Sequence, residues 1–150
     1  MKKIIFRFGF LSLLALFLGG CAGVGDYEIE LPNRYVIVSS SAHEISLNRK
    51  SIEGSLGEAI ISPKISKIAY NDNFVLMEQQ GLKRRSPENE NDMYEIPDES
   101  KVFYWILNHK TDKYYGPFTQ KEFVEKKKEL YIPNNLELKD LSNFKHNHGI

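Results

Sequence analysis

Val102-Phe103-Tyr104-Trp105-Ile106-Leu107 is a continuous apolar stretch within this chain of 150 residues. Side chains alternate between the two faces of a β-strand, so Phe103, Trp105 and Leu107 are predicted on one face and the other three on the opposite face. A strand that is apolar on both faces is typical of a central strand with covering layers on both sides. We therefore expect this stretch to lie at the core of a sheet.

The residues before this stretch predict an antiparallel meander. Residues 26–31 alternate between polar and apolar side chains, as in a strand with one buried face. Pro32-Asn33 supplies a turn into the β-branched and aromatic segment 35–38, so the two segments are expected to form a hairpin. Further strands are expected at 43–47, 65–70 and 74–77, then at 113–115, where Gly116-Pro117 should end the pairing, and finally at 136–141.

Residues 81–101 interrupt this pattern. They are rich in charge, contain Pro87 and Pro97 and have few apolar side chains, so a long loop is predicted. Within it, Lys83-Arg84-Arg85 is a candidate contact for anions or lipid headgroups. The alternative interpretation is a solvated loop without a ligand.

One helix is predicted after the strands. Thr119-Gln120-Lys121-Glu122 fits a capping box, and Phe118 and Phe123 are spaced as a hydrophobic staple. The helix should run to about Leu130, with Phe123, Val124, Leu130 and Tyr131 facing inward. The predicted fold class is therefore α+β: mainly an antiparallel β-sheet meander with one C-terminal helix.

The N-terminus has the features of a cleavable lipoprotein signal peptide. Lys2 and Lys3 are followed, after Arg7, by an uncharged stretch over residues 8–18, the length that a secretory signal needs. Leu18-Gly19-Gly20-Cys21 then resembles the lipobox of bacterial lipoproteins. The resemblance implies cleavage before Cys21 and attachment of a diacylglyceryl group, with its fatty acyl chains such as palmitate, to that thiol.

Two acyl chains hold a protein stably at a membrane, whereas one binds only marginally at about 0.8 kcal/mol per buried methylene. The predicted location is the cell membrane, lipid-anchored at its extracytoplasmic face, with the membrane as the partner of Cys21. The alternative is an uncleaved transmembrane helix over residues 8–25. Five glycines in that segment count against it.

Length and charge set further limits. Removal of the leader leaves 130 residues, enough for one domain, with 17 basic and 20 acidic side chains and a net charge of −3. Nucleic acid is therefore not expected as a partner. The predicted organisation is a signal peptide over 1–20, a lipidated linker over 21–25, one globular domain over 26–141 and a flexible tail over 142–150.

No catalytic motif is evident, and we predict no catalytic, cofactor-binding or metal-binding residue; the single site residue is Cys21. His146-Asn147-His148 offers two imidazoles to a metal, but neither His43 nor His109 is spaced as a third ligand. The many aromatic side chains are expected to serve mostly as core and cross-strand pairs, although they are also suited to a sugar- or peptide-binding face.

The segments Gly25–Asn33, Tyr104-Trp105-Ile106 and Tyr115-Gly116-Pro117 resemble an uncharacterised family of short lipoproteins from spore-forming Gram-positive bacteria. The resemblance covers nearly all of the chain after the leader. It implies a lipid anchor and a single extracytoplasmic domain. It carries over no functional residue, because that family has no assigned activity.

The predicted function is that of a non-enzymatic binding or interaction module at the cell surface. Two alternatives come from other classes. One is a cell-envelope hydrolase whose site is assembled from residues scattered along the chain, and the other is a carrier with an apolar cavity inside its sheet. The sequence identifies neither ligand nor protein partner.

Overall fold

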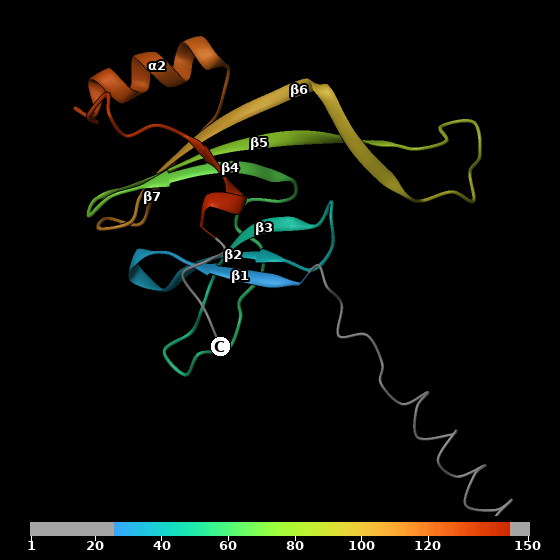
Figure 1. Cartoon of the computed structure of the whole chain (residues 1–150), viewed down its shortest axis with the longest axis horizontal. Coiled ribbons are helices and arrows are strands. Elements are labelled where there is room, and N and C mark those ends of the chain that lie inside the picture. The colour runs from blue at the N-terminus through green and yellow to red at the C-terminus, as the bar shows by residue number, and fades with distance from the viewer. Residues whose placement is uncertain (1–25, 145–150) are drawn as a thin grey trace, which may run out of the picture.

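The computed structural model describes residues 26–144. Three layers are stacked: a three-stranded sheet, a five-stranded sheet and one helix on the outer face of the larger sheet (Figure 1). The elements, in chain order, are β1 (Tyr27–Glu30), η2 (Pro32–Arg34), β2 (Tyr35–Ser39), β3 (Ile45–Arg49), β4 (Ile65–Tyr70), β5 (Phe74–Arg84), β6 (Glu95–Asn108), β7 (Lys113–Phe118), α2 (Gln120–Glu129), β8 (Lys139–Asp140) and η3 (Leu141–Asn143).

Every strand pair is antiparallel, in the orders β1-β2-β3 and β7-β6-β5-β4-β8. The predicted fold class, mainly antiparallel sheet with one C-terminal helix, is confirmed. The predicted N-terminal hairpin is confirmed as well, because β1 pairs with β2 across the turn at η2. Within the described residues, no helix is both long and apolar enough to cross a membrane.

The expected central position of the 102–107 stretch is confirmed. It lies in β6, which pairs with β5 on one side and β7 on the other. Trp105 and Leu107 face the core between the two sheets, while Tyr104 and Ile106 face the core under the helix. Only its first part departs from the prediction, because Val102 and Phe103 are 37% and 36% exposed.

Two apolar cores hold the layers together. The larger lies between the sheets and is centred on Ile37, Leu47 and Met77, each fully buried. The smaller lies between the five-stranded sheet and α2, where Leu76 and Phe123 pack. Because these side chains fill the space between layers, the interior is packed core, and the aromatic residues Tyr35 and Trp105 contribute to it.

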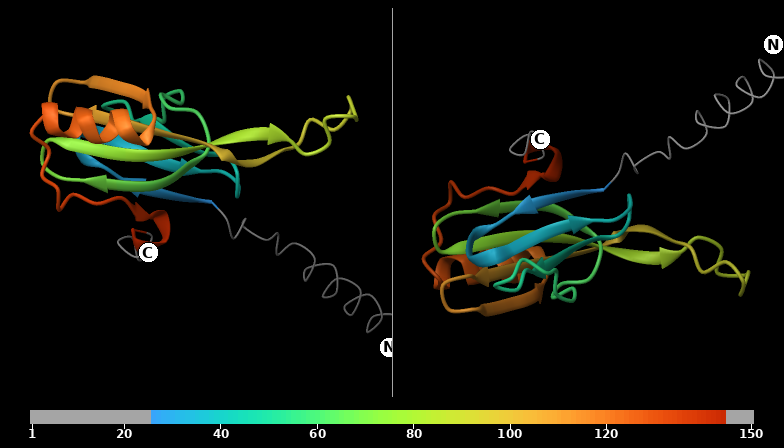
Figure 2. Two further views of the ribbon diagram at one scale, coloured as in Figure 1. Left: turned by 90° about the horizontal axis from the view of Figure 1, so that it is seen from above. Right: turned by 90° about the horizontal axis from the view of Figure 1, so that it is seen from below.

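The predicted loop over residues 81–101 is wrong. β5 runs on to Arg84 and β6 begins at Glu95, so residues 81–84 pair with residues 95–98, and only 85–94 connect them. This pair forms a two-stranded ribbon, named here the ribbon, that extends beyond the sheet (Figure 2). No layer covers the ribbon, so its strands need no buried apolar face and show no alternating pattern.

The base of the ribbon contains an irregularity. The pairing jumps from Gln80 with Val102 to Gly81 with Asp98, which leaves residues 99–101 as an insertion in β6. A Cβ on Gly81 would lie 2.7 Å from the Cβ of Lys101, so glycine permits this close approach. Pro97 lies where β6 has a single neighbour, a position in which the missing N–H faces an open edge at no cost.

The helix begins as predicted. The Thr119 hydroxyl accepts from the Glu122 amide at 3.4 Å, and the Glu122 carboxylate accepts from the Thr119 amide at 2.8 Å, completing the capping box. Phe118 and Phe123 both join the core under the helix. The predicted staple therefore has both of its partners in place.

The prediction that Val124 and Tyr131 face inward is wrong, because Val124 is 45% exposed and Tyr131 is 92% exposed. The helix ends at Glu129 with Leu130 as its C-cap, and the next residue, Tyr131, has a left-handed φ of 54°. The Tyr131 amide donates to the Lys128 carbonyl at 3.1 Å and the Ile132 amide to the Lys127 carbonyl at 2.9 Å. This Schellman arrangement turns Tyr131 outward and buries Ile132 instead.

Two strand boundaries also differ from the predictions. Pairing of β7 does not end at Gly116-Pro117 but continues to Phe118, which lies opposite Tyr104, because an edge strand tolerates proline. The predicted strand over 136–141 is reduced to the two residues of β8. Of the predicted tail, the structure describes residues 142–144, and there Phe144 contacts the Tyr70 ring with centroids 5.8 Å apart.

Candidate functional site

A cluster of polar side chains lies at the end of the molecule opposite the ribbon. Tyr35 is the first residue of β2 and Arg49 is the last residue of β3, and the two are paired across the sheet. Asp112 belongs to the turn between β6 and β7, and Tyr114 follows in β7. The strand directions thus bring three distant segments together, and these four residues are named here the distal cluster.

The Tyr35 hydroxyl is the centre of the distal cluster. It donates to Asp112 Oδ1 at 3.0 Å and accepts from the Tyr114 hydroxyl at 2.6 Å. Arg49 Nη1 donates to Asp112 Oδ2 at 2.9 Å, and the guanidinium lies 4.9 Å from the centroid of the Tyr35 ring. Both oxygens of the carboxylate are therefore engaged.

The electrostatics keep each group in its ordinary charge state. Burial, together with the hydrogen bonds to Tyr114 and Asp112, raises the pKa of the Tyr35 hydroxyl. The hydrogen bonds from Arg49 and Tyr35 lower the pKa of the Asp112 carboxyl, and the bond to Asp112 raises the pKa of Arg49. At neutral pH the tyrosine stays protonated and the carboxylate stays ionised, which suits recognition better than proton transfer.

The backbone around the distal cluster contains three non-glycine residues with left-handed geometry. Asn33, Arg34 and Asp112 have φ of 58°, 65° and 52°. Local bonds hold them: the Asn33 side-chain amide donates to the His109 carbonyl, and Arg34 Nη1 donates to the Lys50 carbonyl at 3.1 Å. Such strain costs about 1 to 3 kcal/mol per residue and persists only where neighbouring contacts enforce it.

The guanidinium groups of Arg34 and Arg49 both stabilise the ionised carboxylate of Asp112. Arg34 adds to the field that holds Asp112 ionised, although its own hydrogen bond goes to a backbone carbonyl. Arg34, Arg49 and Asp112 together carry a net charge of +1, and the Arg49 side chain remains 34% exposed. Fixed guanidinium groups with free N–H donors are suited to binding a carboxylate or phosphate group of a partner.

The structure places the other predicted candidates apart from the distal cluster. Cys21, His146 and His148 lie outside the described residues. His109 is buried and its Nε2 contacts the Asn71 carbonyl at 3.0 Å, whereas the His43 ring packs on Tyr94 near the ribbon. Among the described residues, no group of three histidine, cysteine or carboxylate side chains is arranged to hold a metal ion.

The Lys83-Arg84-Arg85 run has partners of its own within the ribbon. Arg85 Nη2 lies 2.9 Å from Asp92 Oδ2, and Arg84 Nη2 donates to the carbonyls of Asn89 and Asp92 at 2.9 and 3.2 Å. Lys83 Nζ lies 4.0 Å from Asp98 Oδ1. The arginine contacts hold the connection between β5 and β6, and each of the three cations has a partner within the ribbon.

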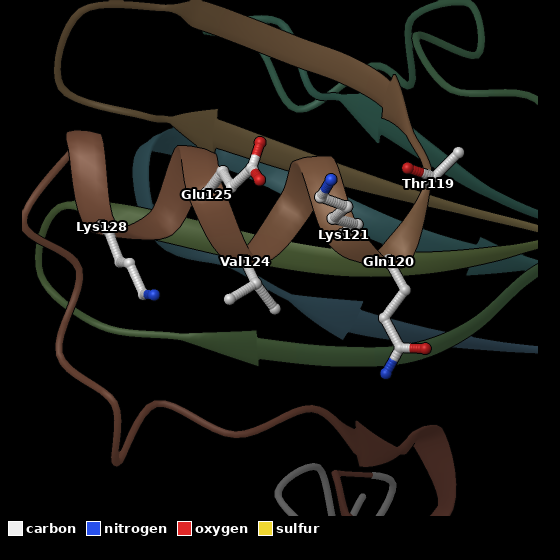
Figure 3. Close-up of a pocket in the computed structure, with 6 residues that line it drawn as sticks. All are labelled: Thr119, Gln120, Lys121, Val124, Glu125 and Lys128. Carbon is white, nitrogen blue, oxygen red and sulfur yellow. The ribbon is translucent and has the colours of Figure 1, made fainter.

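A second surface feature is an open hollow of about 610 Å³ along the exposed side of α2. Figure 3 shows Gln120, Val124 and Lys128 projecting from successive turns on the same side of the helix. The lining comes from Thr119 and α2 alone, so no second element closes the hollow. It lacks the enclosure and the convergent polar groups of a small-molecule site.

Sequence reasoning did not identify the distal cluster. Tyr35 and Asp112 are 77 residues apart, and neither lies in a motif of fixed spacing. One signal was available: a tyrosine that opens a strand and has to be buried needs a partner for its hydroxyl. That signal predicts a hydrogen-bond partner for the Tyr35 hydroxyl but does not identify the partner residue.

Fold and site together define a two-sheet α+β domain with a hydrogen-bonded cluster of polar side chains at one end. Residues 32–142 match the model of DUF3997, a protein family of unknown function, and the chain belongs to that family. The resemblance to an uncharacterised family is confirmed to this extent; the lipid anchor and the bacterial group stay predictions. No curated protein and no solved structure matches the chain.

Proposed function

We propose that this protein is a lipid-anchored, extracytoplasmic binding module, held at the cell membrane through a diacylglyceryl group on Cys21. The observation that carries the proposal is the sequence Leu18-Gly19-Gly20-Cys21 after an uncharged stretch of signal-peptide length. The position of β1 supports it, because the folded domain begins at Tyr27, only a few residues after the cysteine. A short tether of this kind keeps the whole domain close to the membrane.

The distal cluster is the proposed binding region. β2 and β3 run so that Tyr35 and Arg49 lie at the opposite end of the sheet from Tyr27, which pairs with Ser39. A tether attached before Tyr27 therefore leaves the distal cluster facing away from the membrane. The distal cluster itself is neutral, but Arg34 beside it adds one positive charge, which favours a partner that presents a carboxylate or phosphate group.

The charge states of the distal cluster favour binding over hydrolysis. A general acid or base works best when its pKa lies near the operating pH, but the pKa of Tyr35 is raised and the pKa of Asp112 is lowered. Both shifts move the groups away from neutrality. A cell-envelope hydrolase is therefore the weaker alternative, and the packed interior gives an apolar-ligand carrier no support.

The test is retention of the unlipidated chain, residues 22–150, by envelopes isolated from cells that lack the protein. Saturable retention is expected, with a loss in Arg34→Asn, because asparagine tolerates the left-handed backbone while it removes the charge. Lys121→Ala removes an exposed cation of α2 and serves as the matched control. Envelope fragments released enzymatically by the wild type, and not by a variant with one polar side chain replaced, would refute a purely binding role.

A further inference from the structure

The ribbon lies at the end of the molecule where β1 begins. Figures 1 and 2 show it extending past the sheets on the side of the first described residues. The contacts agree, because Tyr27 pairs with Ser39, and the loop that follows Ser39 brings the His43 ring to within 5.9 Å of the Tyr94 ring. The start of β1, the loop between β2 and β3, and the ribbon thus share one end.

The ribbon exposes apolar surface where its connection returns to β6. Met93 is 76% exposed and Tyr94 is 51% exposed, next to each other at the point where the connection enters β6. The arginines near them are paired, and the guanidinium of Arg85 lies 4.9 Å from the centroid of the Tyr94 ring. Residues 83–98 contain three basic and five acidic side chains, so attraction to anionic lipid is not the basis of any membrane contact.

We propose that the ribbon rests on the bilayer surface through Met93 and Tyr94 and so fixes the orientation of the domain, an inference that rests on the proposed anchor at Cys21. Residues 21–25 span at most about 18 Å when fully extended. The paired residues 81–84 carry the ribbon about 14 Å past its base, which places Met93 and Tyr94 just past the far end of the paired strands. Met93, Tyr94 and the anchor are therefore able to meet the same membrane plane.

The side chains suit this position. Tyrosine places its ring at the boundary between lipid and water while its hydroxyl stays hydrated, and methionine adapts to irregular apolar surroundings. Contact at two points, the anchor and the ribbon, restricts tilting of the domain. The distal cluster is then held at the far side, where it faces a partner in the envelope.

The test uses the full lipidated protein in phosphatidylcholine vesicles. Cys21 is the single cysteine of the chain and its thiol is acylated, so Met93→Cys adds one thiol for an environment-sensitive NBD fluorophore. Ile52→Cys is the matched control, because Ile52 is 90% exposed in the loop after β3, near the distal cluster. Tyr94→Cys is a second labelling site, in case the label at residue 93 disturbs the ribbon.

NBD on M93C and Y94C is expected to shift its emission to shorter wavelength and to lose intensity when the vesicles contain doxyl-labelled lipid. NBD on I52C should show neither change. Protein that floats with the vesicles while all three sites behave alike would overturn the ribbon contact and leave the anchor standing. Protein that fails to float would overturn the anchor itself, and with it the orientation proposed here.

Discussion

Replacement of Tyr35 by phenylalanine isolates the hydroxyl at the centre of the distal cluster. Phenylalanine keeps the buried ring beneath the Arg49 guanidinium, but the bond to Asp112 at 3.0 Å and the bond from Tyr114 at 2.6 Å are both lost. The Asp112 and Tyr114 side chains are partly exposed, so water replaces the missing partner. The cost is therefore that of two hydrogen bonds without a buried, unsatisfied group, about 2 kcal/mol.

Thermal unfolding followed by circular dichroism measures this cost. For a domain of this size, a loss of 2 kcal/mol lowers Tm by about 8 °C. Tyr114→Phe removes only one of the two bonds and should lower Tm by about half as much. Tyr115→Phe, whose hydroxyl forms no hydrogen bond among the described residues, is the control and should leave Tm unchanged. A Tyr35→Phe variant that unfolds within 2 °C of the wild type would show that the hydroxyl of Tyr35 does not stabilise the distal cluster.

Two further predictions concern charge and backbone geometry. The folded-state pKa of Asp112 is lowered, so its stabilisation is fully present above its unfolded pKa of about 3.9 and is lost as the pH falls through the folded value. The difference in unfolding free energy between wild type and Asp112→Asn should therefore be constant near neutral pH and shrink as the pH falls below about 3.9, and a constant difference in urea titrations across that range would contradict the assignment. Tyr131→Gly should raise Tm by about 4 °C, because glycine relieves a left-handed penalty of about 1 kcal/mol at an exposed residue. Tyr131→Ala is the matched control and should give no such gain.

Local sequence patterns predicted the parts of the fold that carry a strong local signal. The apolar run in β6 has to be covered on both faces, and the capping box at Thr119 is complete within four residues. The alternation in residues 26–31 is a direct consequence of one buried face. In each of these cases the short-range pattern and the packing of the whole domain require the same structure.

The structural features that the sequence did not predict correctly have physical reasons as well. The ribbon has no buried face, so paired strands in it look like a charged loop until the backbone pairing is seen. The helix ends in a Schellman arrangement in which Tyr131 takes the position where glycine is usual. Without a glycine to mark the end of the helix, the sequence did not indicate that Tyr131 faces outward. The distal cluster depends on contacts between Tyr35 and Asp112 that only the three-dimensional fold creates.

The proposed lipid anchor on Cys21 is tested most directly by the intact mass of the protein expressed with its full leader. Wild type is measured beside Cys21→Ser and beside Ala22→Ser, which keeps the cysteine and changes only its small neighbour. We expect wild-type and Ala22→Ser chains to lack residues 1–20, carry a diacylglyceryl group and fractionate with membranes, and the Cys21→Ser chain to remain uncleaved and unmodified. A full-length chain without lipid in all three would contradict the proposed anchor.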